Sequence, residues 1–172
     1  MTSRVAYRGR SLTVVVEEVE LPNGHRVALD IVKHPGASAV VPFTTERDVL
    51  LIHQFRHAAG GTIWEVPAGK LDGDTPEVCA RKELEEEAGR RAGRLQRLGS
   101  IWTTPGFTDE VIHLFAAFEL EEIPTRHEAA EVIEVVEMPL ARALEMVWSG
   151  ELRDAKSALA LLHAAHRLGR LA

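Results

Sequence analysis

The most informative segment of the chain runs from Gly69 to Gly89 and reads GKLDGDTPEVCARKELEEEAG. Its second part predicts a helix from about Pro76 to Gly89. Thr75 is a favourable N-cap and Pro76 suits the first helical position, while Gly89 is typical of the residue that ends a helix. A glycine-rich turn after an apolar stretch precedes the helix, which places one helix face at the edge of a sheet.

Carboxylates crowd one face of this predicted helix. Residues three and four apart share a face, so Glu83, Glu86 and Glu87 converge while Glu85 points elsewhere. Such like charges destabilise an isolated helix by roughly a few tenths of a kcal/mol per pair. Mg²⁺ or Mn²⁺ would offset this repulsion, because these cations bind carboxylate and phosphate oxygens. The alternative interpretation is a solvated acidic face without a ligand.

The rest of the chain alternates strand and helix patterns. An Asn23-Gly24 turn between β-branched runs predicts a hairpin, and a boundary near Pro35 separates a β-rich region, residues 1–35, from the main domain, residues 36–172. This order favours an α+β fold, an α/β/α sandwich with a mixed sheet. The predicted strands are Ser11–Val19, Arg26–Lys33, Ala37–Thr44, Val49–Phe55, Leu95–Thr103, Val111–Leu120 and Val132–Val136, and the further helices are Pro139–Trp148 and Asp154–Leu168.

Composition excludes several classes of protein. The 172 residues and balanced composition fit a globular domain, and no apolar run is long enough for a membrane span. The net charge of −6 disfavours a nucleic-acid-coating role. A single cysteine cannot form an internal disulfide, which favours the cytoplasm. The sequence therefore predicts a cytoplasmic protein with neither a nucleic acid nor a membrane as partner.

The segment Gly69–Gly89 resembles the Nudix box, the signature of the Nudix hydrolases. That signature begins with a glycine, five variable residues, a glutamate and seven further variable residues. It ends with Arg-Glu, an aliphatic residue, any residue, Glu-Glu, any residue and a glycine. Residues 82–89 match its second half, with Lys82 in place of arginine. The first half departs from it: Asp74 replaces the first glutamate, and four residues separate it from Gly69, so the loop is one residue short. Arg90 stands where an aliphatic residue is usual.

The resemblance extends beyond the box and favours the ADP-ribose pyrophosphatases. Pro105 lies sixteen residues after Gly89, as does the proline that marks that subfamily. The N-terminal hairpin looks like the small domain with which these enzymes form intertwined homodimers. Further segments similar to the subfamily are Gln54–His57, Trp64–Gly69, Thr104–Glu110 and Gly150–Ala158.

This resemblance implies a metal-dependent pyrophosphohydrolase that cleaves the diphosphate of ADP-ribose to AMP and ribose 5-phosphate, or that of a related nucleoside diphosphate-sugar. The alternative is a catalytically weak or silent Nudix domain that binds a nucleotide as a sensor. The intact Glu83, Glu86 and Glu87 favour the enzyme. Lys82 and the short loop favour the sensor, because lysine cannot reproduce the bidentate pairing of arginine.

The resemblance also assigns roles to the charged residues. Glu83 and Glu87 are implied metal ligands, with the Ala68 carbonyl and Glu86 completing a site for two or more Mg²⁺ or Mn²⁺ ions. Glu86 is alternatively a residue that positions water. The general base is expected in the acidic loop downstream, where Glu131 is preferred over Glu128.

Four residues are candidates for substrate binding. Arg56 can clamp a phosphate with paired donors, or is a surface arginine at a strand end. Glu65 can accept hydrogen bonds from a ribose or from adenine, or pair with a nearby base. Arg26 is placed to reach a substrate across a homodimer interface, and Phe107 either contacts the sugar or packs in its loop.

Overall fold

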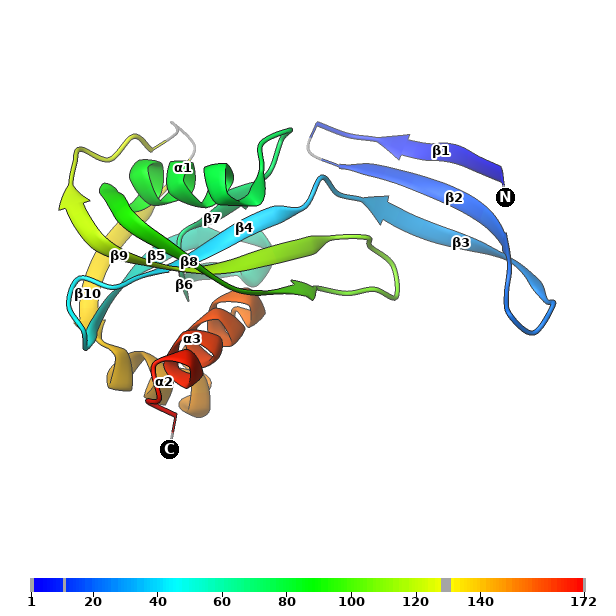
Figure 1. Cartoon of the computed structure of the whole chain (residues 1–172). Coiled ribbons are helices and arrows are strands. Elements are labelled where there is room, and N and C mark those ends of the chain that lie inside the picture. The colour runs from blue at the N-terminus through cyan, green and yellow to red at the C-terminus, as the bar shows by residue number, and fades with distance from the viewer. Residues whose placement is uncertain (1, 11, 128–130, 172) are drawn as a thin grey trace.

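The N-terminal region forms a three-stranded antiparallel sheet that stands apart from the main body (Figure 1). The computed structural model describes residues 2–10, 12–127 and 131–171. The sheet contains β1 (Thr2–Arg8), β2 (Thr13–Glu20) and β3 (Arg26–Lys33) in that order. Gly24, with φ of 82°, closes the turn between β2 and β3, so the predicted hairpin is confirmed. The sequence did not predict β1, and Ser11, the predicted start of the first strand, lies outside the described residues.

The main body contains two sheets. One has the order β10-β5-β6 and is antiparallel, and the other has the order β7-β4-β9-β8, in which β4 and β9 are parallel and the remaining pairs antiparallel. The predicted α+β fold with a mixed sheet is confirmed. The elements are β4 (Ala37–Pro42), β5 (Asp48–Arg56), the 3₁₀ helix η1 (His57–Ala59), β6 (Gly61–Glu65), β7 (Ala68–Lys70), α1 (Pro76–Ala88), β8 (Arg90–Trp102), β9 (Val111–Glu122), β10 (Ile133–Pro139), α2 (Leu140–Ser149) and α3 (Ala155–Arg167).

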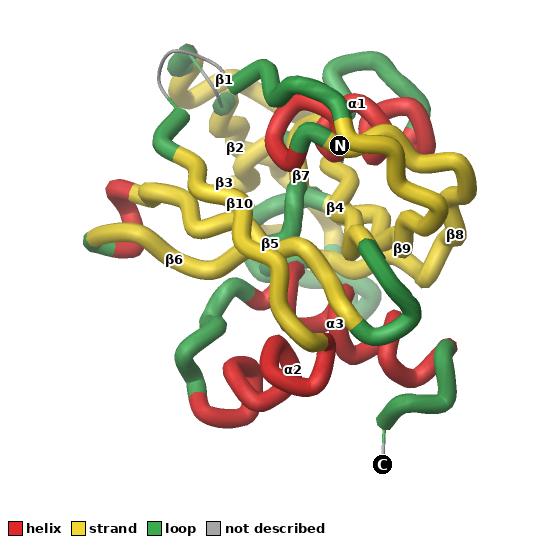
Figure 2. The backbone as a smooth tube through the Cα atoms, turned by 90° about the vertical axis from the view of Figure 1, so that its left-hand side faces the viewer, coloured by secondary structure: helices red, strands yellow, loops and turns green. Residues whose placement is uncertain are grey.

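Helices cover both sides of these sheets. In Figures 1 and 2, α1 lies on one side and α2 and α3 lie on the other. The β5 side chains alternate between the two resulting cores, with Leu50 in the core beneath α1 and Leu51 in the core beneath α2 and α3. The face of β5 that carries Leu50 therefore continues toward α1. In the described residues no helix is long and apolar enough to cross a membrane.

Local chemistry fixes the ends of α1. The Thr75 hydroxyl accepts a hydrogen bond from the backbone N–H of Val78 at 3.4 Å, and Gly89 ends the helix with φ of 60°. A side chain at Gly89 would also meet the Ile123 carbonyl at 2.6 Å. Cys79 is buried at 1% exposure, whereas the neighbouring apolar Val78 is 50% exposed.

The N-terminal sheet is joined to the loop between β8 and β9. The Lys33 ammonium lies 2.8 Å from the Asp109 carboxylate, which also accepts a hydrogen bond from the backbone N–H of His34 at 2.8 Å. The backbone N–H of Val32 donates to the Phe107 carbonyl at 2.7 Å. The position of the sheet is therefore coupled to a loop whose neighbouring residues line the cleft described below.

Candidate functional site

A cleft of about 880 Å³ lies between α1, the ends of β5 and β6, the loop after β8 and the start of α3. One wall is acidic, with Glu83, Glu86 and Glu87 from α1. The other wall carries the cations Arg56 and Lys156. A cleft with carboxylates on one side and ion-paired basic side chains on the other suits a ligand whose phosphates need both a cation bridge to carboxylates and direct basic partners.

The acidic wall is held close to the strand that precedes α1. The Glu87 carboxylate, in a side chain that is almost fully buried, accepts a hydrogen bond from the backbone N–H of Ala68 at 2.9 Å. Glu83 lies directly against Gly69, so that a Cβ atom at Gly69 would collide with its carboxylate. Glycine at this position therefore makes room for Glu83 beside the Ala68–Gly69 backbone.

Burial and mutual repulsion disfavour the charged forms of these carboxylates. Burial raises the pKa of Glu87 to about 8, the Ala68 N–H opposes the shift, and the charges of Glu83 and Glu131 add to it. Burial and the charge of Glu86 raise the pKa of Glu83 to about 7, while Lys82 opposes the shift. Within the described residues, the nearby basic groups do not balance the negative charge of Glu83 and Glu87, because the pKa values of both carboxylates remain raised.

Arg126, which also lines the cleft, approaches the acidic residues of α1. The Arg126 guanidinium lies 3.8 Å from the carboxylate of Glu85 and 3.9 Å from that of Glu86. The neighbouring His127 ring nitrogen Nε2 lies 2.9 Å from the Glu87 carbonyl. The segment after β9 thus contacts the C-terminal turn of α1 on the side where lysine replaces the arginine of the Nudix box.

The donor set fits a hard divalent cation. It combines the Glu83, Glu86 and Glu87 carboxylates with the Ala68 carbonyl, and all of these ligands are oxygens. In the described part of the chain no three His, Cys, Asp or Glu side chains already form a metal cage. A magnesium site needs no such cage, because it commonly uses one or two carboxylates and takes its other oxygens from water and substrate phosphates.

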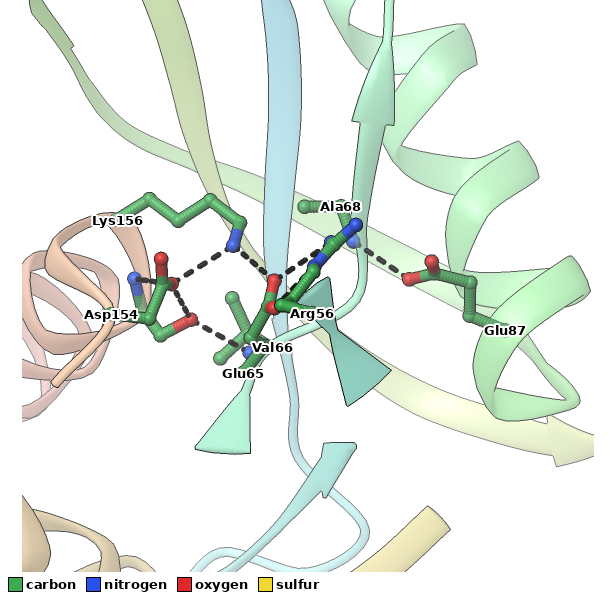
Figure 3. Close-up of polar contacts among 8 residues, drawn as sticks. Arg56, Glu65, Val66, Ala68, Glu87, Asp154 and Lys156 are labelled. Atoms are coloured by element: carbon green, nitrogen blue, oxygen red, sulfur yellow. Dashed lines mark hydrogen bonds and ion pairs between the residues drawn. The ribbon is translucent and has the colours of Figure 1, made fainter. Parts of the chain in front are cut away.

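The cationic wall is a network of ion pairs (Figure 3). The Arg56 guanidinium donates to both carboxylate oxygens of Glu65, from Nε at 2.6 Å and from a terminal nitrogen at 3.0 Å. The Lys156 ammonium bonds to Glu65 and, at 2.9 Å, to Asp154. Burial alone would raise the pKa of Glu65, but the Arg56 hydrogen bond and the Lys156 charge outweigh burial and hold the pKa below its usual value.

The same network fixes the strand leading into the box. Asp154 is the N-cap of α3 and accepts hydrogen bonds from the backbone N–H and the hydroxyl of Ser157. The Ser157 hydroxyl in turn accepts a hydrogen bond from the backbone N–H of Val66 at 2.8 Å. Residues Glu65 to Ala68 therefore lie between α3 on one side and Glu87 of α1 on the other, as Figure 3 shows.

The structure brings most of the predicted site residues together. Ala68, Glu83, Glu86, Glu87, Glu131, Arg56 and Glu65 all line the cleft. Glu65 forms ion pairs with Arg56 and Lys156, which is the alternative foreseen for it, and its side chain is 2% exposed. Glu128 lies outside the described residues.

Two predicted substrate-binding residues lie away from the cleft of their own chain. Arg26 is on the N-terminal sheet, where its side chain is 85% exposed and pairs with Glu20 at 3.2 Å. Phe107 is 53% exposed in the loop after β8 and is not among the residues that line the cleft. The neighbouring Trp102, Thr103 and Thr104 line it instead.

Sequence reasoning missed Lys156 and Asp154, although it noted the segment that contains them. Lys156 meets Glu65 from 91 positions away in the chain, so no local pattern indicates the contact. It also assigned no role to Gln54, which lines the cleft and is 4% exposed. A polar residue two positions before Arg56 on a predicted strand was the available signal.

Comparison with known proteins agrees with this geometry. The family described as NUDIX domain matches residues 32–159. The chain belongs to the Nudix family.

Relatives of known activity cover most of the chain. It is 44% identical to an ADP-ribose pyrophosphatase of Bacillus subtilis over 158 residues, which cover 90% of this chain and 85% of the relative. It is 38% identical to a methanol dehydrogenase activator of Bacillus methanolicus, with the same coverage. It is 41% identical to a GDP-mannose pyrophosphatase of Salmonella arizonae, over 78% of this chain and 76% of the relative.

The fold also matches solved structures. The crystal structure of an ADP compounds hydrolase superposes with a TM-score of 0.86 at 21% identity, covering 99% of this chain and 95% of that one. This match includes the N-terminal sheet as well as the main body.

The ion-pair network predicts how stability depends on pH. Glu65→Gln removes the negative charge that Arg56 and Lys156 share. We expect this substitution to lower the free energy of unfolding near pH 7 by about 2–3 kcal/mol. The expected loss is smaller than for a fully buried pair because Arg56 is half-exposed. The folded-state pKa of Glu65 is lowered, so its stabilisation is present above its ordinary value of 4.5 and is lost as pH falls through the lower folded value. Denaturant unfolding at pH 7 and below pH 4 should show the difference between wild type and variant shrinking on acidification.

Glu134→Gln on the neighbouring strand β10 is the matched control. Its side chain is 74% exposed and pairs with His53 at 4.0 Å, so we expect a change below about 0.5 kcal/mol. Equal losses of stability in the two variants at pH 7 would contradict a stabilising role for the Glu65 network.

Proposed function

We propose that this Nudix protein is a metal-dependent pyrophosphohydrolase that cleaves the diphosphate of ADP-ribose to AMP and ribose 5-phosphate, or that of a related nucleoside diphosphate-sugar. The observation that carries the proposal is the cleft in which the Glu83, Glu86 and Glu87 carboxylates face Arg56 and Lys156. Relatives named ADP-ribose pyrophosphatase and GDP-mannose pyrophosphatase support this substrate class.

The carboxylate wall is the part of the cleft that would hold Mg²⁺ or Mn²⁺. Glu83, Glu87 and the Ala68 carbonyl are the proposed ligands, with Glu86 as a further ligand or as a residue that positions water. Divalent cations bound there would neutralise phosphate charge and acidify water, and we propose two or more ions per site. Burial of Glu83 and Glu87 without a balancing cation supports a site that is built to be completed by metal.

The side chains of this protein supply the proton transfer and the positioning. In the proposed reaction water adds to one phosphorus, the bridging P–O bond breaks, and the proton lost by water passes to Glu131. Two observations support this role for Glu131: it lines the cleft, and its charge raises the pKa of both Glu83 and Glu87. Glu128 is retained as the alternative general base.

Arg56 and Lys156 are the proposed partners of the phosphates. Glu65 holds Arg56 through Nε and one terminal nitrogen, so its planar guanidinium is fixed in orientation while the side chain remains 43% exposed at the cleft. We assign Glu65 the positioning of Arg56, rather than a direct contact with ribose or adenine, because both of its oxygens are already bonded.

We propose an enzyme rather than a silent nucleotide sensor because of the carboxylate cluster. A binding protein gains nothing from a cluster of buried carboxylates that repels phosphate in the absence of metal. Lys82 lies at the cleft and lowers the pKa of Glu83 by its charge, so part of the role of the missing arginine is retained. The free, buried Cys79 supports a reducing site of action, which we propose to be the cytoplasm.

Catalysis by the carboxylate cluster is tested by release of AMP from ADP-ribose with Mg²⁺ or Mn²⁺. We expect Glu86→Gln and Glu87→Gln each to lower turnover by at least about 100-fold, comparable to the loss of an acid–base group. Glu85→Gln is the matched control, because Glu85 is on the same helix but pairs with Arg91 at 3.1 Å outside the cleft.

The same assay separates the candidate substrates and functions. GDP-mannose, ADP-glucose, FAD, NADH, diadenosine polyphosphates and nucleoside triphosphates are included to rank ADP-ribose against other diphosphates. Wild-type protein that releases no nucleoside monophosphate from the whole panel would overturn the enzyme in favour of the sensor. Unchanged turnover in both cleft variants would overturn the roles assigned to Glu86 and Glu87.

We also propose that residues 1–35 form a homodimerisation region. The support is the N-terminal sheet itself, which stands apart from the main body and exposes apolar side chains, including Val5 at 51% and Tyr7 at 60%. Arg26 is remote from the cleft of its own chain, so its proposed contact with substrate requires the cleft of a second copy. Residues 36–172 then form the Nudix hydrolase domain.

The dimer is tested by light scattering. We expect a mass twice the 19.0 kDa of the chain, and we expect Tyr7→Glu to shift the protein toward monomer because it places a charge in the apolar interface. Trp148→Glu, which changes an aromatic residue 70% exposed on α2, should leave the mass unchanged. Monomeric wild-type protein would contradict the proposal.

A further inference from the structure

A buried amide on the floor of the cleft has an unsatisfied acceptor. Gln54 on β5 is 4% exposed and lines the cleft, and its side-chain oxygen Oε1 has no hydrogen-bond partner among the described residues. A buried polar group left without a partner costs roughly 1–3 kcal/mol. Few buried polar groups in native structures lack a partner, and one that lines a cleft is accessible to a donor on a ligand.

The strand pairing places this oxygen on the side of the sheet that faces α1. Gln54 shares a β5 face with Leu50, which packs beneath α1, and with Arg56, which lies two residues further along. On the neighbouring strands Gln54 is paired with Ile63 of β6 and Ile133 of β10. The amide therefore lies between two apolar residues, and it is more buried than Arg56, whose side chain is 43% exposed.

The chemistry of an unpaired acceptor limits what it can bind. Phosphate oxygens are acceptors at neutral pH, so a phosphate placed against Oε1 would leave both groups unsatisfied. A hydroxyl group is a donor and can satisfy the amide. In a nucleoside diphosphate-sugar the hydroxyls are on the two sugars, which flank the diphosphate that Arg56 and the carboxylate wall are proposed to hold.

We propose that Gln54 is a specificity-determining residue whose amide oxygen accepts a hydrogen bond from a sugar hydroxyl of the substrate. The proposal rests on the diphosphatase function proposed above and adds to it a reason for preferring sugar-bearing diphosphates. A site built to bond a hydroxyl discriminates strongly against analogues that lack it, because the buried partner is then left unpaired. Gln54 thus complements Arg56, which recognises charge but not sugar.

The test compares Gln54→Met with wild type, since methionine conserves the volume and removes the acceptor. kcat/KM is measured for ADP-ribose, for the methyl ester of ADP, which lacks the distal sugar, and for the ADP-ribose analogue without hydroxyls on the nucleoside ribose. We expect the variant to lose 10- to 100-fold on ADP-ribose, a range of roughly the size expected for one lost hydrogen bond. We expect less than a 2-fold loss, on the order of assay scatter, on the analogue that lacks the hydroxyl bound by Gln54.

The two analogues distinguish the two possible sources of the hydroxyl. If Gln54→Met leaves kcat/KM for the methyl ester unchanged, the hydroxyl bound by Gln54 is on the distal sugar. If it leaves kcat/KM for the deoxy analogue unchanged, the hydroxyl is on the nucleoside ribose. Equal losses on all three substrates, or no loss on any, would overturn the proposal. Wild-type protein inactive on ADP-ribose would instead overturn the proposed function.

Thermal unfolding of the substrate-free protein gives a readout independent of activity. We expect Gln54→Met to leave Tm unchanged or to raise it, because replacing an unpaired acceptor by an apolar group removes a desolvation cost. Gln96→Met is the matched control, since Gln96 lies on β8 away from the cleft and is bonded to Arg94 at 3.5 Å. A fall in Tm for Gln54→Met beyond that of the control would show a structural amide and overturn the proposal.

Discussion

The buried carboxylate of Glu87 and the half-buried carboxylate of Glu83 beside it set what the surrounding chain must support. Glu87 is almost fully buried and Glu83 lies against Gly69, so both occupy places where a neutral or apolar side chain would stabilise the fold better. Burial raises the pKa of both groups, and the charges of Glu86 and Glu131 increase that cost. This unfavourable arrangement lies in the cleft, where a divalent cation and a diphosphate would relieve it.

Such an arrangement requires rigid support from the chain around it. The Ala68 backbone is fixed to Glu87 on one side, and Val66 is fixed to Ser157 of α3 on the other. The same α3 terminus supplies Lys156, which together with Arg56 neutralises Glu65. One short segment therefore carries the proposed carbonyl ligand, anchors the arginine proposed to bind phosphate and joins the two helical layers.

The parts of the fold that the sequence predicted are those set by local chemistry. Thr75, Pro76 and Gly89 bracket α1 because capping depends on adjacent residues, and the Asn23-Gly24 hairpin follows from the same kind of rule. β1 was missed because all of its residues are exposed and it has no apolar periodicity. Its position is set by pairing with β2.

The candidate site likewise has residues that local sequence predicts and residues that only tertiary contacts bring into place. The grouping of the α1 carboxylates could be predicted, because it depends on spacing along one helix and on the resemblance to the Nudix box. Lys156 and the ion pairs around Glu65 depend on contacts between segments 91 residues apart, which no local pattern specifies. The importance of Gln54 likewise depends on its burial between β6 and β10, which the order of residues alone does not give.

Binding of a cation by the buried carboxylates can be measured by thermal unfolding of wild type and Glu87→Gln during titration with Mg²⁺ or Mn²⁺, without substrate. If the buried carboxylates form an incomplete cation site, metal at about 100 times its Kd should stabilise the wild type by about 2.7 kcal/mol. Above pH 8, where Glu87 is mostly ionised without metal, Glu87→Gln should be more stable than wild type, since it removes a buried charge, and it should respond much less to metal. A wild type unaffected by either cation, or an equal response in the variant, would contradict the account.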